Sequence, residues 1–188
     1  MFNKALAFAA VLLASPALAE GDGPGPNLVI EVDGMAKGEI VIDLNPDIAP
    51  KHVAQIVALA KAGAYDNVVF HRVIEGFMAQ TGDVQYGKKG GDTAMAGMGG
   101  STMPNIPAEF SAVPFERGIV GMARASDPDS ANSQFFIMFA PGDFLNGQYT
   151  VVGKVISGMD VVDAIKRGEG DSGAVTDPDV MTKVTVKE

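Results

Sequence analysis

Cysteine is absent from the 188-residue sequence and histidine occurs only twice, and both shortages limit the chemistry available. Without cysteine the chain can form neither a disulfide nor a thiolate nucleophile. His52 and His71 cannot make a zinc site unless distant carboxylates join them. The acidic segment 127–129 lacks the glycine and the terminal glutamate of a calcium-binding loop. We therefore expect no metal site.

Basic residues are also scarce. The sequence has 14 lysines and arginines against 23 aspartates and glutamates, a formal net charge of −9. Binding to nucleic acid requires a basic face, so this balance argues against a nucleic-acid partner.

A long apolar run occurs only at the start of the chain. Lys4 precedes apolar residues 5–14, and residues 17–19, Ala-Leu-Ala, form a small-x-small cleavage pattern. The run is too short to span a bilayer, so we predict that residues 1–19 are a secretory signal peptide, with an uncleaved anchor as the alternative. Cleavage of these 19 residues from the 188 would leave 169, with no stable insertion in a membrane. Export without cysteine favours the bacterial periplasm.

The rest of the sequence is consistent with a flexible leader at residues 20–27 and one domain at residues 28–188. The Gly- and Met-rich segment 82–111 is predicted to be a long loop. Short strands with few, separated helices favour a mainly β barrel or sandwich, whose ligand site would lie outside it or under the loop. The pattern predicts strands at 28–33, 39–44, 68–74, 77–81, 118–123, 134–139, 150–156 and 180–186, and helices at 47–63 and 159–167.

Two short motifs resemble catalytic signatures but lack their essential partners. Residues 82–89 match the spacing of a phosphate-binding loop, but Lys89 stands where a magnesium-binding Ser or Thr is needed. Residues 170–173, Gly-Asp-Ser-Gly, resemble the nucleophile motif of serine proteases, but neither histidine lies in the sequence setting of that family. We interpret both segments as turns.

The most unusual residue is Arg72, a cation inside an apolar alternating run. Strand periodicity puts it on one face with Phe70 and Ile74, where a guanidinium is costly without polar partners. Gln80 and Gln134 occur at strand spacing among further apolar residues, which indicates a cavity rather than a closed core. The apolar residues around this predicted cavity are Phe77, Met78, Phe136, Phe144, Leu145 and Tyr149.

Three ordered groups of residues carry a resemblance to a known family. They are F-H-R-V-I-x-G-F-M-x-Q-x-G-D at 70–83, G-M-A-R-A with S-Q-F-F-I at 121–125 and 133–137, and F-L-x-G at 144–147. Together they resemble the cyclophilin-type peptidyl-prolyl cis-trans isomerases, with bacterial exported members the most similar, over essentially the whole chain from Leu28 onward. The resemblance implies a closed eight-stranded antiparallel barrel capped by two helices. It also implies cofactor-independent rotation of X–Pro bonds.

The resemblance further implies how a substrate would be held. Arg72 would donate a hydrogen bond to the prolyl nitrogen, and Gln80 would hold its guanidinium in place. Gln134 would contact the substrate from one side. The substrate chain would align as an added strand along the backbone of Ala123, Arg124 and Ala125.

An apolar pocket for the proline ring is implied as well. Its walls would be Phe77, Met78, Phe136 and Leu145, with Tyr149 at its edge where many members have histidine. Phe144 stands where many eukaryotic members have a tryptophan that helps to bind cyclosporin. Phenylalanine cannot donate the indole hydrogen bond, so we expect weak cyclosporin binding.

The expected partners are proline-containing unfolded or nascent exported polypeptides, bound by a monomer and assisted in folding. A holdase that binds proline peptides with little turnover is the alternative. The methionine-rich segment 95–103 suggests it, because flexible methionines make adaptable contacts.

Overall fold

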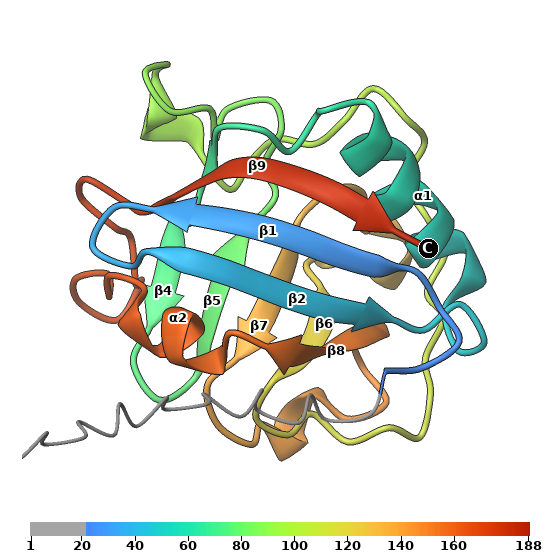
Figure 1. Ribbon diagram of the computed structural model, residues 1–188. Coiled ribbons are helices and arrows are strands. Elements are labelled where there is room, and N and C mark those ends of the chain that lie inside the picture. The colour runs from blue at the N-terminus through green and yellow to red at the C-terminus, as the bar shows by residue number, and fades with distance from the viewer. Residues whose placement is uncertain (1–21) are drawn as a thin grey trace, which may run out of the picture.

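The computed structural model describes residues 22–188, so the predicted signal peptide lies outside the described residues. These residues form a mainly β fold of nine strands and two α-helices (Figure 1). No helix in this part of the chain is long and apolar enough to cross a membrane. The strands are β1 (Asn27–Asp33), β2 (Gly38–Leu44), β3 (Val68–Val69), β4 (Arg72–Ile74), β5 (Met78–Thr81), β6 (Ile119–Met122), β7 (Phe135–Met138), β8 (Val151–Ser157) and β9 (Val180–Lys187), and the helices are α1 (Pro50–Lys61) and α2 (Met159–Ala164).

All nine strands belong to one antiparallel sheet in the order β3-β9-β1-β2-β8-β6-β7-β5-β4. Figure 1 shows β9, β1 and β2 in front of β4, β5, β7 and β6, so the sheet curls round and faces itself. Its end strands β3 and β4 are consecutive in the chain and are joined only by Phe70 and His71. The strand predicted at 68–74 is thus two strands. The closed eight-stranded barrel is not confirmed, because β3 and β4 are linked covalently rather than by a hydrogen-bonded ladder.

The bend between β3 and β4 also corrects the predicted face of Arg72. Phe70 and Val73 both lie in the main buried core, although strict alternation would put them on opposite faces. Arg72 is half-buried, and Ile74 packs against a second, smaller apolar cluster. The prediction that Arg72 shares a face with Phe70 was therefore wrong.

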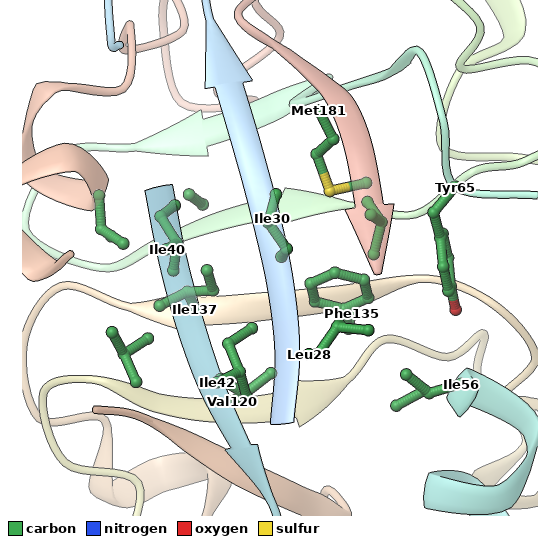
Figure 2. Packing of buried hydrophobic residues seen from close by; sticks show 14 of the residues in the cluster. Leu28, Ile30, Ile40, Ile42, Ile56, Tyr65, Val120, Phe135, Ile137 and Met181 are labelled. Carbon is green, nitrogen blue, oxygen red and sulfur yellow. The ribbon is translucent and has the colours of Figure 1, made fainter. Parts of the chain in front are cut away.

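The main core fills the space enclosed by the curled sheet. Side chains of β1, β2, β6, β7 and β9 meet there, and α1 adds Ile56 at one end (Figure 2). Tyr65 closes the same end, with its ring edge-on to Phe135 at 5.7 Å and its hydroxyl donating to the Ser133 carbonyl at 2.8 Å. Burial raises the pKa of this tyrosine well above its usual range. Because side chains occupy the interior, a ligand has to bind outside it.

The described part of the leader lies against the sheet. The Gly23 amide donates to Asp43 Oδ2 at 3.0 Å, and the Leu44 amide donates to the Pro26 carbonyl at 3.1 Å. The chain then enters β1 at Asn27. These contacts fix the course of the chain before the domain begins.

The long segment 82–111 contains no strand, and one buried carboxylate organises its first half. Asp83 Oδ1 accepts hydrogen bonds from the amides of Gln85 (3.0 Å) and Tyr86 (2.9 Å). Its Oδ2 accepts from the amides of Gly97 (2.8 Å) and Gly99 (2.9 Å). Four charge-assisted bonds to one fully buried side chain hold this part of the loop in a defined conformation.

Glu109, later in the same segment, caps helix α1 from a distance. Ala49 at the N-cap position offers no side-chain acceptor. The Glu109 carboxylate instead accepts from the amides of Lys51 and His52, and its Oε2 lies 2.6 Å from Nδ1 of the buried His52. Burial alone would raise the pKa of the Glu109 carboxyl, but the bonds to His52 and the amides hold the pKa below its usual value. This carboxylate therefore stabilises the fold when ionised.

We expect Glu109→Gln to lower the free energy of unfolding by about 1.5–3 kcal/mol near neutral pH, the contribution of hydrogen bonds to a charged group. A carboxyl whose pKa is depressed in the folded state stabilises above its unfolded pKa of about 4.3, and that stabilisation is lost as the pH falls through the lower folded value. The difference between the two proteins should therefore vanish in acid. Urea unfolding across this pH range measures it.

Glu188→Gln is the matched control. Lys61 also lowers the pKa of the Glu188 carboxyl, but that side chain is 77% exposed and its ion pair is screened by water. A loss of stability as large as that of Glu109→Gln would contradict the proposed capping role.

Candidate active site

Two neighbouring cavities open on the outer side of the sheet, beside β4, β5 and β7. The apolar cavity has a volume of about 420 Å³ and the loop cavity about 490 Å³. Gln80, Ala123 and Arg124 line both, so the two cavities adjoin, and together they are called the cleft below. The apolar cavity is lined by Arg72, Phe77, Met78, Gln80, Ala123, Arg124, Phe136, Phe144, Leu145, Gln148 and Tyr149. The loop cavity is lined by Gln80, residues 97–101, Asn105, residues 123–125, Ser130 and residues 132–134.

Strand register produces the floor of the apolar cavity. Arg72 of β4 pairs with Gln80 of β5, Gln80 pairs with Phe136 of β7, and Phe136 pairs with Gly121 of β6. Paired residues point to the same side of a sheet, so these four positions form one row on the outer face. A Cβ at Gly121 would lie 2.5 Å from the Phe115 ring and 2.6 Å from the Phe136 ring. Glycine therefore leaves the space in which these two rings stack.

Two acceptors hold the Arg72 guanidinium. Its Nη1 donates to Gln80 Oε1 at 3.2 Å, and its Nε donates to the Ser172 carbonyl at 3.0 Å. Ser172 is in place because its segment runs beside β4, where the Val73 amide donates to the Gly173 carbonyl at 2.8 Å. Nη2 makes no hydrogen bond within residues 22–188, so this group remains free to donate to a ligand.

A hydrogen-bond relay runs from Arg72 to the long loop. Gln80 accepts from Arg72 and donates through Nε2 to Gln134 Oε1 at 2.9 Å. Gln134 in turn donates through Nε2 to the carbonyls of Gly97 (3.0 Å) and Gly99 (2.7 Å). The amides of these two glycines are the ones bonded to Asp83. The relay thus connects the cation at the cavity to the buried carboxylate that holds the loop.

His71, the neighbour of Arg72 in the chain, takes no part in this relay. Both ring nitrogens are buried and have no hydrogen-bond partner within the described chain. Burial lowers the pKa of the imidazole. The negative charge of Asp83 acts in the opposite direction, and the positive charge of Arg72 lowers the pKa further. The neutral ring is therefore the favoured form.

The apolar walls consist of packed rings and a more open rim. The Phe136 ring stacks on Phe115 at 5.8 Å and meets Tyr149 edge-on at 6.0 Å. The Phe77 ring lies 5.3 Å from Phe144, whose side chain is 66% exposed. A buried floor with an exposed aromatic rim can take a small apolar ring and still leave its polar neighbours in solvent.

The structure brings the sequence-predicted site residues into one cleft. Ten of the twelve line the apolar cavity, while Ala125 and Gln134 line only the loop cavity. Sequence reasoning missed Gln148 in the lining and the carbonyl of Ser172 behind Arg72. A backbone carbonyl is present at every position, so no residue type could have marked it. Within residues 22–188, no group of three or more His, Asp or Glu side chains could hold a metal ion.

Solved structures share this fold. A cyclophilin from Hirschia baltica superimposes with a TM-score of 0.71 and 26% identity, covering 87% of this chain and 74% of that one. A cyclophilin-type peptidyl-prolyl cis-trans isomerase from Cryptosporidium parvum, crystallised in the presence of the dipeptide Ala-Pro, gives a TM-score of 0.74 and 27% identity. The match covers 86% of this chain and 99% of that one.

Sequence relatives agree with the structural ones. The family model described as "Cyclophilin type peptidyl-prolyl cis-trans isomerase/CLD" matches residues 28–186. A Brucella suis protein named "Probable peptidyl-prolyl cis-trans isomerase" is 55% identical over 186 residues, which cover 97% of this chain and 93% of the relative. With nearly the whole domain matched and the relative more than half identical, this chain belongs to the cyclophilin-type peptidyl-prolyl cis-trans isomerases.

Proposed function

We propose that this isomerase acts on X–Pro bonds of exported polypeptides in the periplasm, assisting their folding, with Arg72 as its catalytic residue. The observation that carries the proposal is the position of the Arg72 guanidinium. It lines an apolar cavity of about 420 Å³ while Gln80 and Ser172 hold two of its nitrogens. The third nitrogen, Nη2, would donate a hydrogen bond to a bound substrate.

Such a donor suits the reaction. Rotation about a peptide bond meets a barrier of about 18–20 kcal/mol, because amide resonance is lost as the bond twists. The prolyl nitrogen of the twisted amide regains its lone pair and becomes a better acceptor. A fixed guanidinium therefore binds the twisted state more strongly than either planar isomer, which is the condition for acceleration. No bond to the enzyme has to form.

The apolar cavity supports anchoring of the proline ring. Met78, Phe136 and Leu145 are almost fully buried and pack together in the smaller apolar cluster. A ring held against them would stay fixed while the preceding carbonyl turns. The Cryptosporidium parvum relative was crystallised in the presence of Ala-Pro. A proline dipeptide is thus a reasonable minimal ligand to test here.

The backbone at Arg124 supports alignment of the substrate chain. Ala123 donates its amide to the Gln134 carbonyl at 3.0 Å, and Ala125 donates its amide to Ser130 Oγ at 2.9 Å. Between them, the amide and carbonyl of Arg124 have no hydrogen-bond partner within residues 22–188. An extended peptide could pair with them as an added strand.

Replacing Arg72 with Ala should lower kcat/KM for a short X–Pro peptide by about ten- to hundredfold, the value of a charge-assisted hydrogen bond of about 1.5–3 kcal/mol. Arg72→Lys should also lose most activity, because an ammonium cannot keep the bonds to both holders and a donor for the substrate. Exchange NMR of the peptide measures the rate directly. Arg117→Ala, outside the cleft, is the control. Near-normal turnover by Arg72→Ala would overturn the assignment.

A holdase activity is the second candidate, and exposed methionines of the long loop favour it. Met95, Met98 and Met103 are 50%, 77% and 36% exposed, which is unusual for such apolar side chains. We expect protection of an aggregating client to survive Arg72→Ala and to fall severalfold when Met95 and Met98 become serine. Light scattering of the client measures it.

Met35→Ser is the matched control for the holdase, since Met35 is 70% exposed and lies outside the loop, between β1 and β2. Protection that disappears with Arg72→Ala would assign the effect to turnover. If Met35→Ser reduces protection equally, the loop methionines have no special role in it.

Export is tested on the full chain. Expressed in a bacterium, it should appear in the periplasmic fraction with an intact mass that corresponds to a start at Glu20, because cleavage is predicted after Ala19. Replacing Ala17 and Ala19 with bulky residues should leave the precursor uncut. A full-length protein in the cytoplasmic fraction would refute the periplasmic assignment.

A further inference from the structure

The four arginines of the chain differ in their electrostatic surroundings. Arg117 donates to both oxygens of Asp163, at 2.8 and 2.7 Å, and Arg167 forms an ion pair with Glu75. Neither Arg72 nor Arg124 has a carboxylate within 4.0 Å in residues 22–188. The two arginines outside the cleft are paired, and the two that line it are not. The proposed reaction accounts for Arg72 and leaves the charge of Arg124 unexplained.

Neutral groups alone hold Arg124. Its Nη1 donates to the carbonyls of Ala125 (2.9 Å) and Ser126 (3.3 Å), and its Nη2 donates to the Gln148 carbonyl (3.0 Å). Its Cζ lies 4.4 Å from the centre of the Tyr149 ring, and its Nε is buried without a hydrogen-bond partner in the described part of the chain. These contacts orient the guanidinium but leave its charge uncompensated. A cation that is already fixed loses little side-chain entropy when it binds a ligand.

The cleft around Arg124 is cationic in an acidic protein. Among residues 22–188, Arg72 and Arg124 are the only charged residues that line either cavity, whereas the whole sequence carries a net charge of −9. Asp127 and Asp129 follow Arg124 in the chain and are exposed, but neither lines a cavity or forms an ion pair with the guanidinium. A bound peptide therefore meets local positive charge.

We propose that Arg124 makes this enzyme prefer peptides with a carboxylate side chain within two residues of the proline. The inference rests on the proposed function, since it takes the proline ring to occupy the apolar cavity. Arg124 lines both cavities and so stands where the chain next to that proline crosses from one to the other. Asp or Glu at such a position is attracted, Gln is neutral and Lys is repelled.

The test is a series of short proline peptides with Glu, Gln or Lys at each of the two positions before and the two after the proline. Exchange NMR gives kcat/KM without a coupled protease, whose own charge preference would interfere. At one or more positions the wild type should turn over the Glu peptide about three- to tenfold faster than the Gln peptide, a size expected for a half-exposed charge pair. Added salt should reduce that ratio.

Variants assign the preference to one side chain. Arg124→Gln should bring the Glu-to-Gln ratio close to one, and Arg124→Lys should keep part of it. The ratio is compared within each variant, so a change in overall turnover does not disturb it. Arg117→Gln removes one positive charge outside the cleft and should leave the ratio as in the wild type.

Two results would overturn the inference. The first is a Glu-to-Gln ratio that is the same in the wild type and in Arg124→Gln. The Arg124 guanidinium would then only pack against Tyr149 and would not select the peptide. The second is an equal fall of the ratio in Arg117→Gln, which would trace the preference to net charge. Turnover of no peptide by the wild type would instead refute the proposed function, and the inference with it.

Discussion

The antiparallel register of β4, β5, β7 and β6 is the constraint on which the site depends. Two rows of paired residues alternate across these strands. Arg72, Gln80, Phe136 and Gly121 form the outer row, and the next row inward consists of Val73, Ala79, Ile137 and Val120, all buried in the main core. A slip of one residue would exchange the rows and put a guanidinium into the core. The apolar inner row therefore stabilises the placement of Arg72, the residue proposed to be catalytic.

Hydrogen bonds from Gln80 and Gln134 extend this ordered arrangement from the sheet to the long loop. The side-chain amide of Gln80 donates to Gln134 and accepts from Arg72. Once Gln134 is fixed, the Gln80 amide has only one orientation in which its oxygen faces Arg72. Gln134 is fixed by carbonyls of a loop whose shape depends on the buried Asp83. The long segment without strands is thus part of the site. Through Gln134 and Gln80 its carbonyls help to hold the Arg72 guanidinium in one orientation.

Much of this arrangement could be predicted from the sequence, because apolar periodicity marks strands and helices wherever one face is buried. Most element bounds lie within a few residues of prediction, and an arginine among apolar residues correctly indicated a cavity. The bend at Phe70–His71 was missed, since alternation is a local rule and the turn of the curled sheet there is a tertiary effect. The carbonyls of Ser172, Gly97 and Gly99 were missed because backbone groups carry no sequence signal.

The floor and the rim of the cleft obey different constraints. Core packing of Val73, Ala79 and Ile137 on the other side of the sheet fixes the backbone of the floor, and with it the positions of the outer-face residues. Phe144 and Met98 on the rim are 66% and 77% exposed, and Arg124 is bound only to carbonyls and a ring. Substitution there costs little stability, because few buried contacts are lost. The floor can therefore keep the reaction constant while the rim adapts to particular polypeptides.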